Sequence, residues 1–559
     1  MKDQGLGVDV IINDIQSNPR CTHGPTILFE RFQNDGTSKR YYACSACRDR
    51  KDCPFYHSAD QKFTQAKAEV WQDVIKKATP TLTHAEVYKR AKVIKTLSPS
   101  ERMYCCDCSQ LIGSKQQGHH KTHALKTSVS DEQLKKPSTL LPPKESSRFE
   151  AQYLFAANST DILMSMLEQL QARKVLCLGA PRIFETIVNS PAKKMSALLL
   201  DIDDRYGAFF SPEQFLCYNM FNHYFFGGEM AQNTYKKFLS GKEKMVVVSD
   251  PPFGGRMELL GHNLLTVQNE WRDANKLTKA DQLSVLFIFP YFMEPQVLEN
   301  LPKFTMLDYQ VDYDNHPLYS SGMKGMINGS AVRVFVNDHP SLFPLPDEKG
   351  YRHCDICNRW VRTNNVHCEK CKGCMSKDGR TYKHCDECNK CVKPSWMHCS
   401  NCLKCQPQDH RCSEMAHGAK KIFACHICGE EGHKRMDCPK RKRSLAPSVS
   451  HLKKKKQKLE KKMEKESVGK ENIKENSVSK KSMKNKSKKG KDMPAIGKPN
   501  AGKSPEAKTK TDTKTGITNV TKQSKKFSTK QKNANANAKN KMTPMEKTKK
   551  KNNKKKMKN

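Results

Sequence analysis

Apolar runs alternate with helical patterns through the middle of the chain. Each run is long enough for one buried strand, and the stretches between the runs leave room for helical crossovers. The runs lie at residues 174–179, 197–201, 245–250, 284–290 and 331–336. This pattern predicts a doubly wound α/β sheet over residues 148–345, and such sheets bind ligands at the carboxyl ends of their strands.

Charge and cysteine content describe the rest of the chain. The net charge is +41, and much of it lies in a lysine-rich segment, 441–559, which has too few apolar residues to form a core. We interpret this segment as a disordered basic tail that attracts a polyanion; a merely solvated tail is the alternative. The 24 cysteines stand mostly in C-x2-C units with histidines, which is metal-ligand spacing. Without an apolar leader or a run near the ~20 residues that span a bilayer, we expect a soluble protein in a reducing compartment.

An Asp-Pro-Pro-Phe tetrapeptide directly follows the third run. It resembles the (Asp/Asn)-Pro-Pro-aromatic motif of amino-methyltransferases, which methylate exocyclic base nitrogens. A carboxylate and a backbone carbonyl can each accept one N–H bond from an adenine amine, so catalysis would be mainly positioning. The prolines stiffen the turn, and the ring can stack on a flipped-out base. An ordinary turn is the alternative reading of the candidate catalytic residues, which are Asp250, Pro251, Pro252 and Phe253.

The loops after the first two runs predict a cofactor pocket. The first loop begins at Gly179 but departs from a Gly-x-Gly-x-Gly pattern. Asp201 ends the second run, where an acid accepts hydrogen bonds from ribose hydroxyls; a helix N-cap or a surface acid is the alternative. Asn219 and Met220 are placed to meet the adenine end of the cofactor. The residues expected to bind S-adenosyl-L-methionine are Gln152, Tyr153, Leu154, Phe155, Gly179, Arg182, Asp201, Asn219, Met220 and Asp250.

Two sparse clusters near the start of the chain predict zinc fingers. Three cysteines and one histidine, interspersed with aromatic and basic residues, resemble a GRF-type finger, and that composition suits single-stranded nucleic acid. Its ligands are Cys21, His23, Cys44 and Cys53, with Cys47 as an alternative. The second cluster predicts a two-Cys two-His site from Cys105, Cys108, His123 and either His120 or His119.

A repeat of the form His-Cys-x2-Cys-x2-Cys begins at His367, His384 and His398. With its flanking residues it supplies enough ligands for about four tetrahedral zinc ions, but the spacing leaves the pairing of ligands open. The end of the repeat resembles the Asp-His-His-Cys module of palmitoyltransferases, with Arg411 in place of the second histidine, so we interpret it as structural. The candidate ligands are Cys354, Cys357, His367, Cys368, Cys371, Cys374, His384, Cys385, Cys388, Cys391, His398, Cys399, Cys402, Cys405, His410 and Cys412.

A zinc knuckle with complete C-x2-C-x4-H-x4-C spacing follows, and knuckles bind single-stranded RNA or DNA. Its ligands are Cys425, Cys428, His433 and Cys438. The basic cluster at 440–443 directly after it is typical of nuclear import or phosphate binding; a solvated charge run is the alternative.

The order of these motifs resembles the CCHC zinc-finger-containing ribosomal-RNA adenine N6-methyltransferases of animals. The matching segments are 152–155, 179–182, 200–203, 219–223 and 250–255, and the resemblance extends over about residues 20–440. It implies S-adenosyl-L-methionine as the methyl donor and one adenosine of large-subunit rRNA as the target. It also implies nuclear or nucleolar residence, and it favours His120 with His123 in the second finger.

The expected fold is α/β, with a Rossmann-like S-adenosylmethionine-dependent methyltransferase core flanked by several small zinc-binding modules and a disordered basic tail. The expected order is a GRF-type finger at 15–60, a helical connector at 61–100, a two-Cys two-His finger at 101–125, a linker at 126–147, the methyltransferase domain at 148–345, a multi-zinc module at 350–415, the knuckle at 421–440 and the tail at 441–559.

We therefore expect an enzyme that methylates the exocyclic amine of one rRNA adenosine, with S-adenosyl-L-methionine and several zinc ions as cofactors, and that supports ribosome function and translation. Two rivals remain, an N6-adenine methyltransferase acting on mRNA or DNA and a non-catalytic zinc-finger RNA-binding protein. A protein acyltransferase would need a membrane anchor. The expected partners are rRNA that is single-stranded at its target adenosine and proteins of ribosome assembly or RNA processing. The cytoplasm is a further expected compartment.

Overall fold

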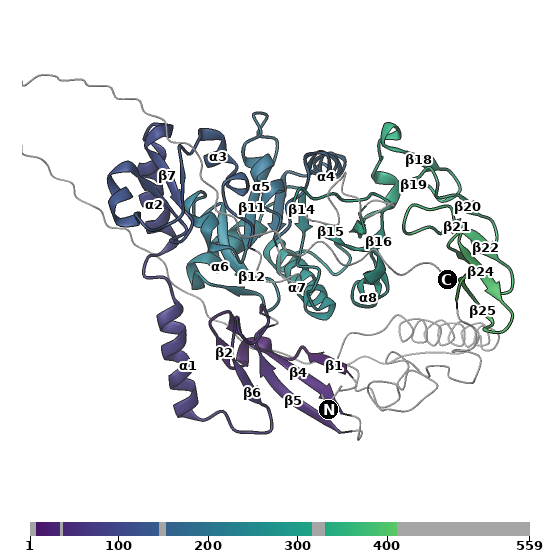
Figure 1. Cartoon of the computed structure of the whole chain (residues 1–559), viewed down its shortest axis with the longest axis horizontal. Coiled ribbons are helices and arrows are strands. Elements are labelled where there is room, and N and C mark those ends of the chain that lie inside the picture. Colours follow the sequence, from purple (N-terminus) through teal and green to yellow (C-terminus); the bar gives the residue numbers. More distant parts are fainter. Residues whose placement is uncertain (1–6, 34–36, 48, 145–151, 316–329, 411–559) are drawn as a thin grey trace, which may run out of the picture. The chain divides into compact units, whose positions relative to one another are not determined.

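A computed structural model describes residues 7–33, 37–47, 49–144, 152–315 and 330–410 of the chain (Figure 1). None of the helices in these ranges is both long and apolar enough to traverse a membrane. The knuckle, the basic tail and Cys412 lie outside the described residues.

A mixed eight-stranded sheet forms the centre of the methyltransferase region. Its five central strands, β12, β11, β10, β14 and β15, are parallel, whereas β13, β17 and β16 pair antiparallel at the two edges. In spatial order the strands are β13 (Tyr224–Phe225), β12 (Phe215–Asn219), β11 (Ser196–Asp201), β10 (Lys174–Leu178), β14 (Met245–Ser249), β15 (Ser284–Pro290), β17 (Val332–Val336) and β16 (Thr305–Met306).

Helices cover both faces of this sheet. Successive side chains of a strand point to opposite faces, so Val175 and Cys177 of β10 enter one core while Leu176 and Leu178 enter the other. The first core includes α4 (Ala157–Gln169) and α5 (Pro181–Val188), and the second includes α6 (Gly228–Leu239), α7 (Met257–Asn275) and α8 (Glu294–Asn300). The predicted doubly wound α/β fold is confirmed. All five predicted strands form, and β12, β13 and β16 are additional strands.

The N-terminal finger is built on a four-stranded antiparallel sheet. Its strands are β1 (Gly7–Ile11), β4 (Ile27–Phe32), β5 (Ser38–Ala43) and β6 (Tyr56–Ser58), and the short β2 (Arg20–Cys21) and β3 (Gly24–Pro25) form a separate hairpin. Two helices follow, α1 (Gln65–Ala78) and α2 (His84–Lys95). Thr83 and Glu86 make a capping box that begins α2, because such a pair satisfies two backbone N–H groups that the helix leaves unbonded.

The second finger carries a three-stranded sheet of β7 (Arg102–Cys105), β8 (Gln110–Gly113) and β9 (Leu125–Thr127). The segment after it, for which composition predicts a polar linker, is described as far as residue 144. It holds α3 (Asp131–Lys135) and buries Leu140 and Leu141 in the first core. Ser138 donates from its backbone N and its Oγ to the buried carboxylate of Glu185, at 2.8 and 2.6 Å. Residues 131–141 of this segment therefore pack against the sheet domain despite its polar composition.

Four successive hairpins form the Cys-rich module. They pair β18 (Tyr351–Cys354) with β19 (Arg359–Arg362), β20 (His367–Cys368) with β21 (Gly373–Cys374), β22 (Lys383–Cys385) with β23 (Lys390–Val392), and β24 (Trp396–Cys399) with β25 (Lys404–Pro407).

Candidate active site

The register of the sheet brings three predicted residues together at one edge. Leu178 pairs with Leu200 of β11 on one side and with Ser249 of β14 on the other. The residues at or just beyond these ends are Gly179, Asp201 and Asp250. Because the three strands are parallel, these residues lie side by side at the carboxyl edge, where α/β sheets bind their ligands.

Gly179 is the residue around which this edge is packed. Its φ is +65°, a conformation that disfavours other L residues, and a Cβ there would stand 2.9 Å from the carbonyl oxygen of Asp250 and 3.0 Å from Cε of Met220. The backbone N of Asp250 donates to the carbonyl of Leu178 at 3.0 Å. The predicted cofactor loop and the catalytic loop are thus in direct contact, and a glycine is needed between them.

The pKa values of the two carboxyl groups of the site, Asp201 and Asp250, are both raised. Burial raises the pKa of Asp201 to about 7, with Asp203 adding to the rise. Burial also raises the pKa of Asp250 well above its usual range, and Asp201 adds to that rise, while a hydrogen bond from Tyr313 opposes it. The Tyr313 hydroxyl donates to Oδ1 of Asp250 at 2.9 Å. Perturbed carboxyl groups are typical of functional sites.

The predicted segment 152–155 lies beside this edge and pairs with the residues that follow Tyr313. The backbone N of Leu154 donates to Oδ1 of Asn315 at 2.8 Å, and the carbonyl of Leu154 accepts from the N of Asp314 at 2.9 Å. The guanidinium of Arg182 donates to the carbonyl of Phe155 and to the carboxylate of Asp314. Arg182 therefore joins the predicted cofactor segment at Phe155 to Asp314, the residue after Tyr313.

The ring of Phe253 lies in an aromatic cluster. It stacks on Tyr153 with ring centroids 5.9 Å apart and meets Tyr313 and Phe289 edge-on at 5.9 and 6.2 Å. The ring is partly exposed. The stacking of Phe253 on a base stays a prediction. The stacked ring of Tyr153 shows that one face of Phe253 can pack against a planar group.

Asn219 is buried and uses its side-chain amide outside the cofactor pocket. Its Nδ2 donates to the carbonyl of His23 at 2.9 Å and to Oγ of Ser45 at 3.0 Å. A contact between Asn219 and the cofactor would therefore involve its backbone. Met220, by contrast, packs its methyl group against Gly179.

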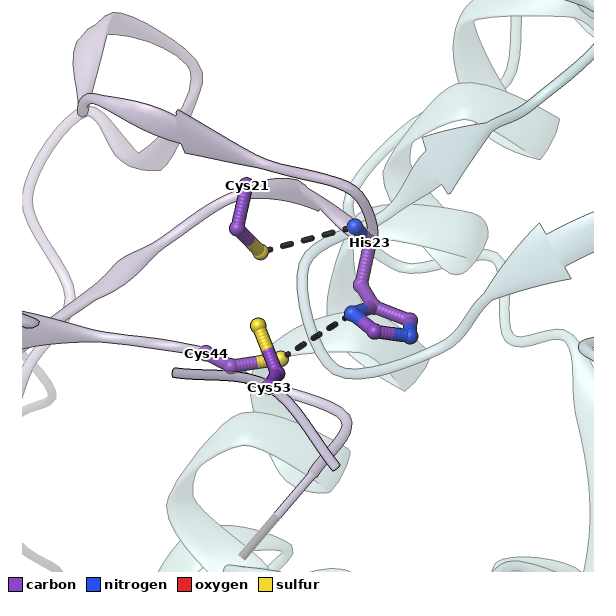
Figure 2. A group of neighbouring side chains, drawn as sticks. All are labelled: Cys21, His23, Cys44 and Cys53. Atoms are coloured by element: carbon purple, nitrogen blue, oxygen red, sulfur yellow. Dashed lines mark hydrogen bonds between the residues drawn. The ribbon is translucent and has the colours of Figure 1, made fainter. Parts of the chain in front are cut away.

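The ligands predicted for the first finger form one cluster, Cys21, His23, Cys44 and Cys53, whose ligand atoms all lie within 4.8 Å of one another. Figure 2 shows the three sulfurs and the imidazole converging, with Nδ1 of His23 3.5 Å from Sγ of Cys44. Hydrogen bonds with Cys44 and Cys53 raise the pKa of His23 to about 10, despite its burial. Three sulfurs and one nitrogen at this spacing suit tetrahedral zinc.

The second finger brings together Cys105, Cys108, His120 and His123. Of the two histidines that the residues alone left open, His120 is the one in the cluster. Its Nδ1 lies 3.5 Å from Sγ of Cys108 and 3.2 Å from Nδ1 of His123.

The Cys-rich module pairs its ligands in an interleaved manner. Each site takes a C-x2-C pair from one hairpin, and its histidine and last cysteine come from farther along, on either side of the next C-x2-C pair. The three complete groups among the described residues are Cys354, Cys357, His367 and Cys374; Cys368, Cys371, His384 and Cys391; and Cys385, Cys388, His398 and Cys405. Farther along, Sγ of Cys402 lies 3.5 Å from Nε2 of His410, and hydrogen bonds with the carbonyl of Pro407 and with Cys399 raise the pKa of His410.

A groove of about 610 Å³ separates the first finger from the catalytic loop. Three aromatic rings stack along its finger wall, with centroids 5.6 Å apart for Phe29 and Tyr41 and 5.2 Å apart for Tyr41 and Tyr56. The guanidinium of Arg50 lies 4.1 Å from the Tyr56 ring centroid. The groove is lined by Phe29, Arg31, Lys39, Tyr41, Arg50 and Tyr56 of the finger and by Pro252, Gly254, Gly255 and Arg256 of the catalytic loop.

Comparison with known proteins agrees with this geometry. A family model described as a probable N6-adenine methyltransferase matches residues 146–324. The human rRNA N(6)-adenosine-methyltransferase ZCCHC4 is 42% identical over 471 residues, which cover 83% of this chain and 90% of the human protein. The protein of that name from Xenopus laevis is 44% identical over 442 residues, 78% of this chain and 89% of its own length. The chain belongs to this methyltransferase family.

Membership in the methyltransferase family agrees with the motif at residues 250–253 and with the α/β core around it. One residue of the site escaped the sequence analysis. Tyr313, which bonds Asp250, stands outside every recognised motif, and it reaches the site through an isolated bridge to Phe155. The polar residues beside it, Asp312, Asp314 and Asn315, are the local feature of the sequence that could have indicated a functional role for this segment.

Proposed function

We propose that this methyltransferase transfers a methyl group from S-adenosyl-L-methionine to the exocyclic amine of one adenosine in large-subunit rRNA. The names of its relatives support rRNA as the substrate class. The target nucleotide is reached from the groove between the first finger and the catalytic loop. The product supports ribosome function and translation, and the enzyme works in the nucleus or nucleolus alongside ribosome-assembly proteins.

The observation that carries the proposal is the continuity of this groove with the Asp-Pro-Pro-Phe loop. Stacked aromatic rings with arginines over them are the composition that binds single-stranded nucleic acid, and each stacked base contributes about 1–3 kcal/mol. Tyr41 and Tyr56 stand on the finger side, and Pro252 and Gly254 on the catalytic side. A strand held along the finger would therefore deliver one base to Asp250.

The residues at the carboxyl edge fit the cofactor. Asp201 is a buried acceptor for ribose hydroxyls, and Gly179 lets the predicted cofactor loop pack directly on the catalytic loop. S-adenosyl-L-methionine supplies an electrophilic methyl group when bound. The protein itself positions the amine: Asp250 has a second carboxylate oxygen, Oδ2, and Pro251 has a carbonyl, so two N–H bonds can be accepted. Excluding water from this buried corner strengthens both bonds.

The zinc clusters support a binding role for the modules around the core. Zinc ligation supplies folding free energy to domains with little apolar core, so the fingers can present rigid basic and aromatic surfaces. The knuckle, with Cys425, Cys428, His433 and Cys438, and the lysine-rich tail are proposed to hold RNA outside the catalytic pocket, because phosphate contacts away from the target base fix the register of a bound nucleic acid.

The test is mass spectrometry of nucleosides from rRNA, mRNA and DNA of cells that express the full chain or lack it. We expect N6-methyladenosine to fall in rRNA alone. Asp250→Ala should fail to restore it, whereas Asp273→Ala, an exposed acid on α7, should restore it fully. Loss of the mark from mRNA or DNA instead would replace the proposed substrate, and restoration by Asp250→Ala would remove Asp250 from the chemistry.

A further inference from the structure

The turn from Asn219 to His223 touches both loops of the catalytic site. It connects β12 to β13, and its apolar residues point to the methyltransferase side. Cε of Met220 is 3.0 Å from the Cβ position of Gly179, and Cε1 of Phe221 is 2.9 Å from the Cβ position of Gly255. One residue of the turn thus packs on the cofactor loop, and the next packs on the catalytic loop.

The polar residues of the same turn are bound to the first finger. Asn219 and Asn222 both donate to the carbonyl oxygen of His23, at 2.9 and 3.0 Å. Asn222 also donates to the carbonyl of Pro25 at 2.8 Å, and its own carbonyl accepts from Nε2 of Gln16 at 2.9 Å. Both asparagines are buried, so these bonds are shielded from water and costly to lose.

The acceptor of these bonds is part of a metal cluster. His23 supplies a ring nitrogen to the four-residue cluster, and the second acceptor of Asn219, Ser45, directly follows the ligand Cys44. A metal ion that holds the ring of His23 and the sulfur of Cys44 also fixes the backbone that carries them. A metal ion bound to this cluster would therefore restrain the direction of the His23 carbonyl.

The core holds the opposite side of the turn. His223 has a φ of +54° and lies between the hydroxyl of Tyr218, 2.7 Å from its Nδ1, and the carboxylate of Glu270, 3.1 Å from its Nε2. Tyr235 donates to the same carboxylate at 2.8 Å. Because the core anchors the turn at His223, a movement of the finger would tilt the turn. That tilt would shift Met220 and Phe221 against Gly179 and Gly255.

We infer that Asn219 and Asn222 are positioning residues through which a zinc ion in the first finger shapes the cofactor pocket. The finger then has two roles, holding the nucleic-acid strand and keeping the pocket in the form that binds S-adenosyl-L-methionine. This coupling rests on the proposed function, because it requires that cofactor. It makes cofactor affinity depend on metal bound at a site that does not touch the cofactor.

The test compares cofactor affinity and zinc content in the full chain and its variants. Calorimetry measures the dissociation constant of S-adenosyl-L-methionine, and elemental analysis measures bound zinc. Asn222→Ala should weaken cofactor binding about tenfold while zinc content stays unchanged, because two buried hydrogen bonds are lost. The matched control is Asn365→Ala. That asparagine of the Cys-rich module is equally buried and donates to Asp308 of the methyltransferase region and to the carbonyl of Ser376. Its loss should leave cofactor affinity within about twofold.

A double-variant cycle tests the route of the coupling. Cys44→Ser should remove about one zinc per chain and weaken cofactor binding. Combined with Asn222→Ala it should add little, because both changes break the same connection. Fully additive losses, or a Cys44→Ser protein with wild-type cofactor affinity, would overturn the coupling. If Asn222→Ala does not fold, Gln16→Ala removes an exposed anchor of the same turn and should weaken binding about two- to threefold; unchanged affinity there would count equally against it. A wild-type chain that binds no S-adenosyl-L-methionine would overturn the proposed function itself.

Discussion

Replacing Gly179 by alanine tests the packing of the two loops at the carboxyl edge. The new Cβ meets two atoms of different kinds, the flexible methyl of Met220 at 3.0 Å and the rigid backbone oxygen of Asp250 at 2.9 Å. Met220 can move aside, but Asp250 cannot move without shifting the catalytic loop. The positive φ adds about 1–2 kcal/mol of strain for an alanine.

We therefore expect Gly179→Ala to lose about 1–2 kcal/mol of stability and about 10–100-fold in turnover, because small misplacements of a positioned group are costly. Gly228→Ala separates the two effects. Gly228 has a φ of +59° with nothing within 4 Å of its Cβ position, so that variant carries the strain without the contact. Denaturant unfolding and single-turnover methylation measure the two quantities. Equal turnover of the two variants would refute the argument from loop contact.

Three further predictions concern the cofactor acid, the zinc module and the RNA-binding modules. Burial and Asp203 raise the pKa of Asp201 to about 7, so this side chain becomes protonated as the pH falls below 7. Calorimetry should therefore show cofactor binding weaken about tenfold from pH 8 to pH 6. The Asp201→Asn variant should bind the cofactor weakly at both pH values, and a wild-type affinity that does not change with pH would contradict the role of Asp201. Cys388→Ser should lower the zinc content of the chain by about one in elemental analysis, and an unchanged content would contradict the role of Cys388 as a metal ligand. The double variant Cys425→Ser with Cys428→Ser should strongly reduce methylation of RNA while leaving cofactor affinity unchanged. Truncation after residue 445 should make RNA binding less dependent on salt concentration. Wild-type methylation by the knuckle variant would count against this division of roles.

The sequence predicted most of the sheet because strand signals are local. An apolar run such as 245–250 needs only its own residues to indicate a buried parallel strand. β12 was not predicted because Phe215–Asn219 mixes apolar residues with a cysteine and an asparagine. The segment at 126–147 was predicted as a linker because its composition is polar, yet Ser138 finds the buried carboxylate of Glu185. That bond joins residues 47 positions apart, and no local pattern reports it.

The candidate site divides in the same way. The motif at 250–253, the acid Asp201 and the C-x2-C units were determined by the sequence alone, because each depends on residue types at short spacing. Tertiary structure decided which cysteines and histidines cluster together, that His120 rather than His119 joins the second finger, and that Tyr313 bonds Asp250. It also showed that the side chain of Asn219, a predicted cofactor contact, donates to the carbonyl of His23. The physical reason is distance along the chain: Asn219 and His23 are 196 residues apart, and only packing of the folded chain brings such groups within reach of a hydrogen bond.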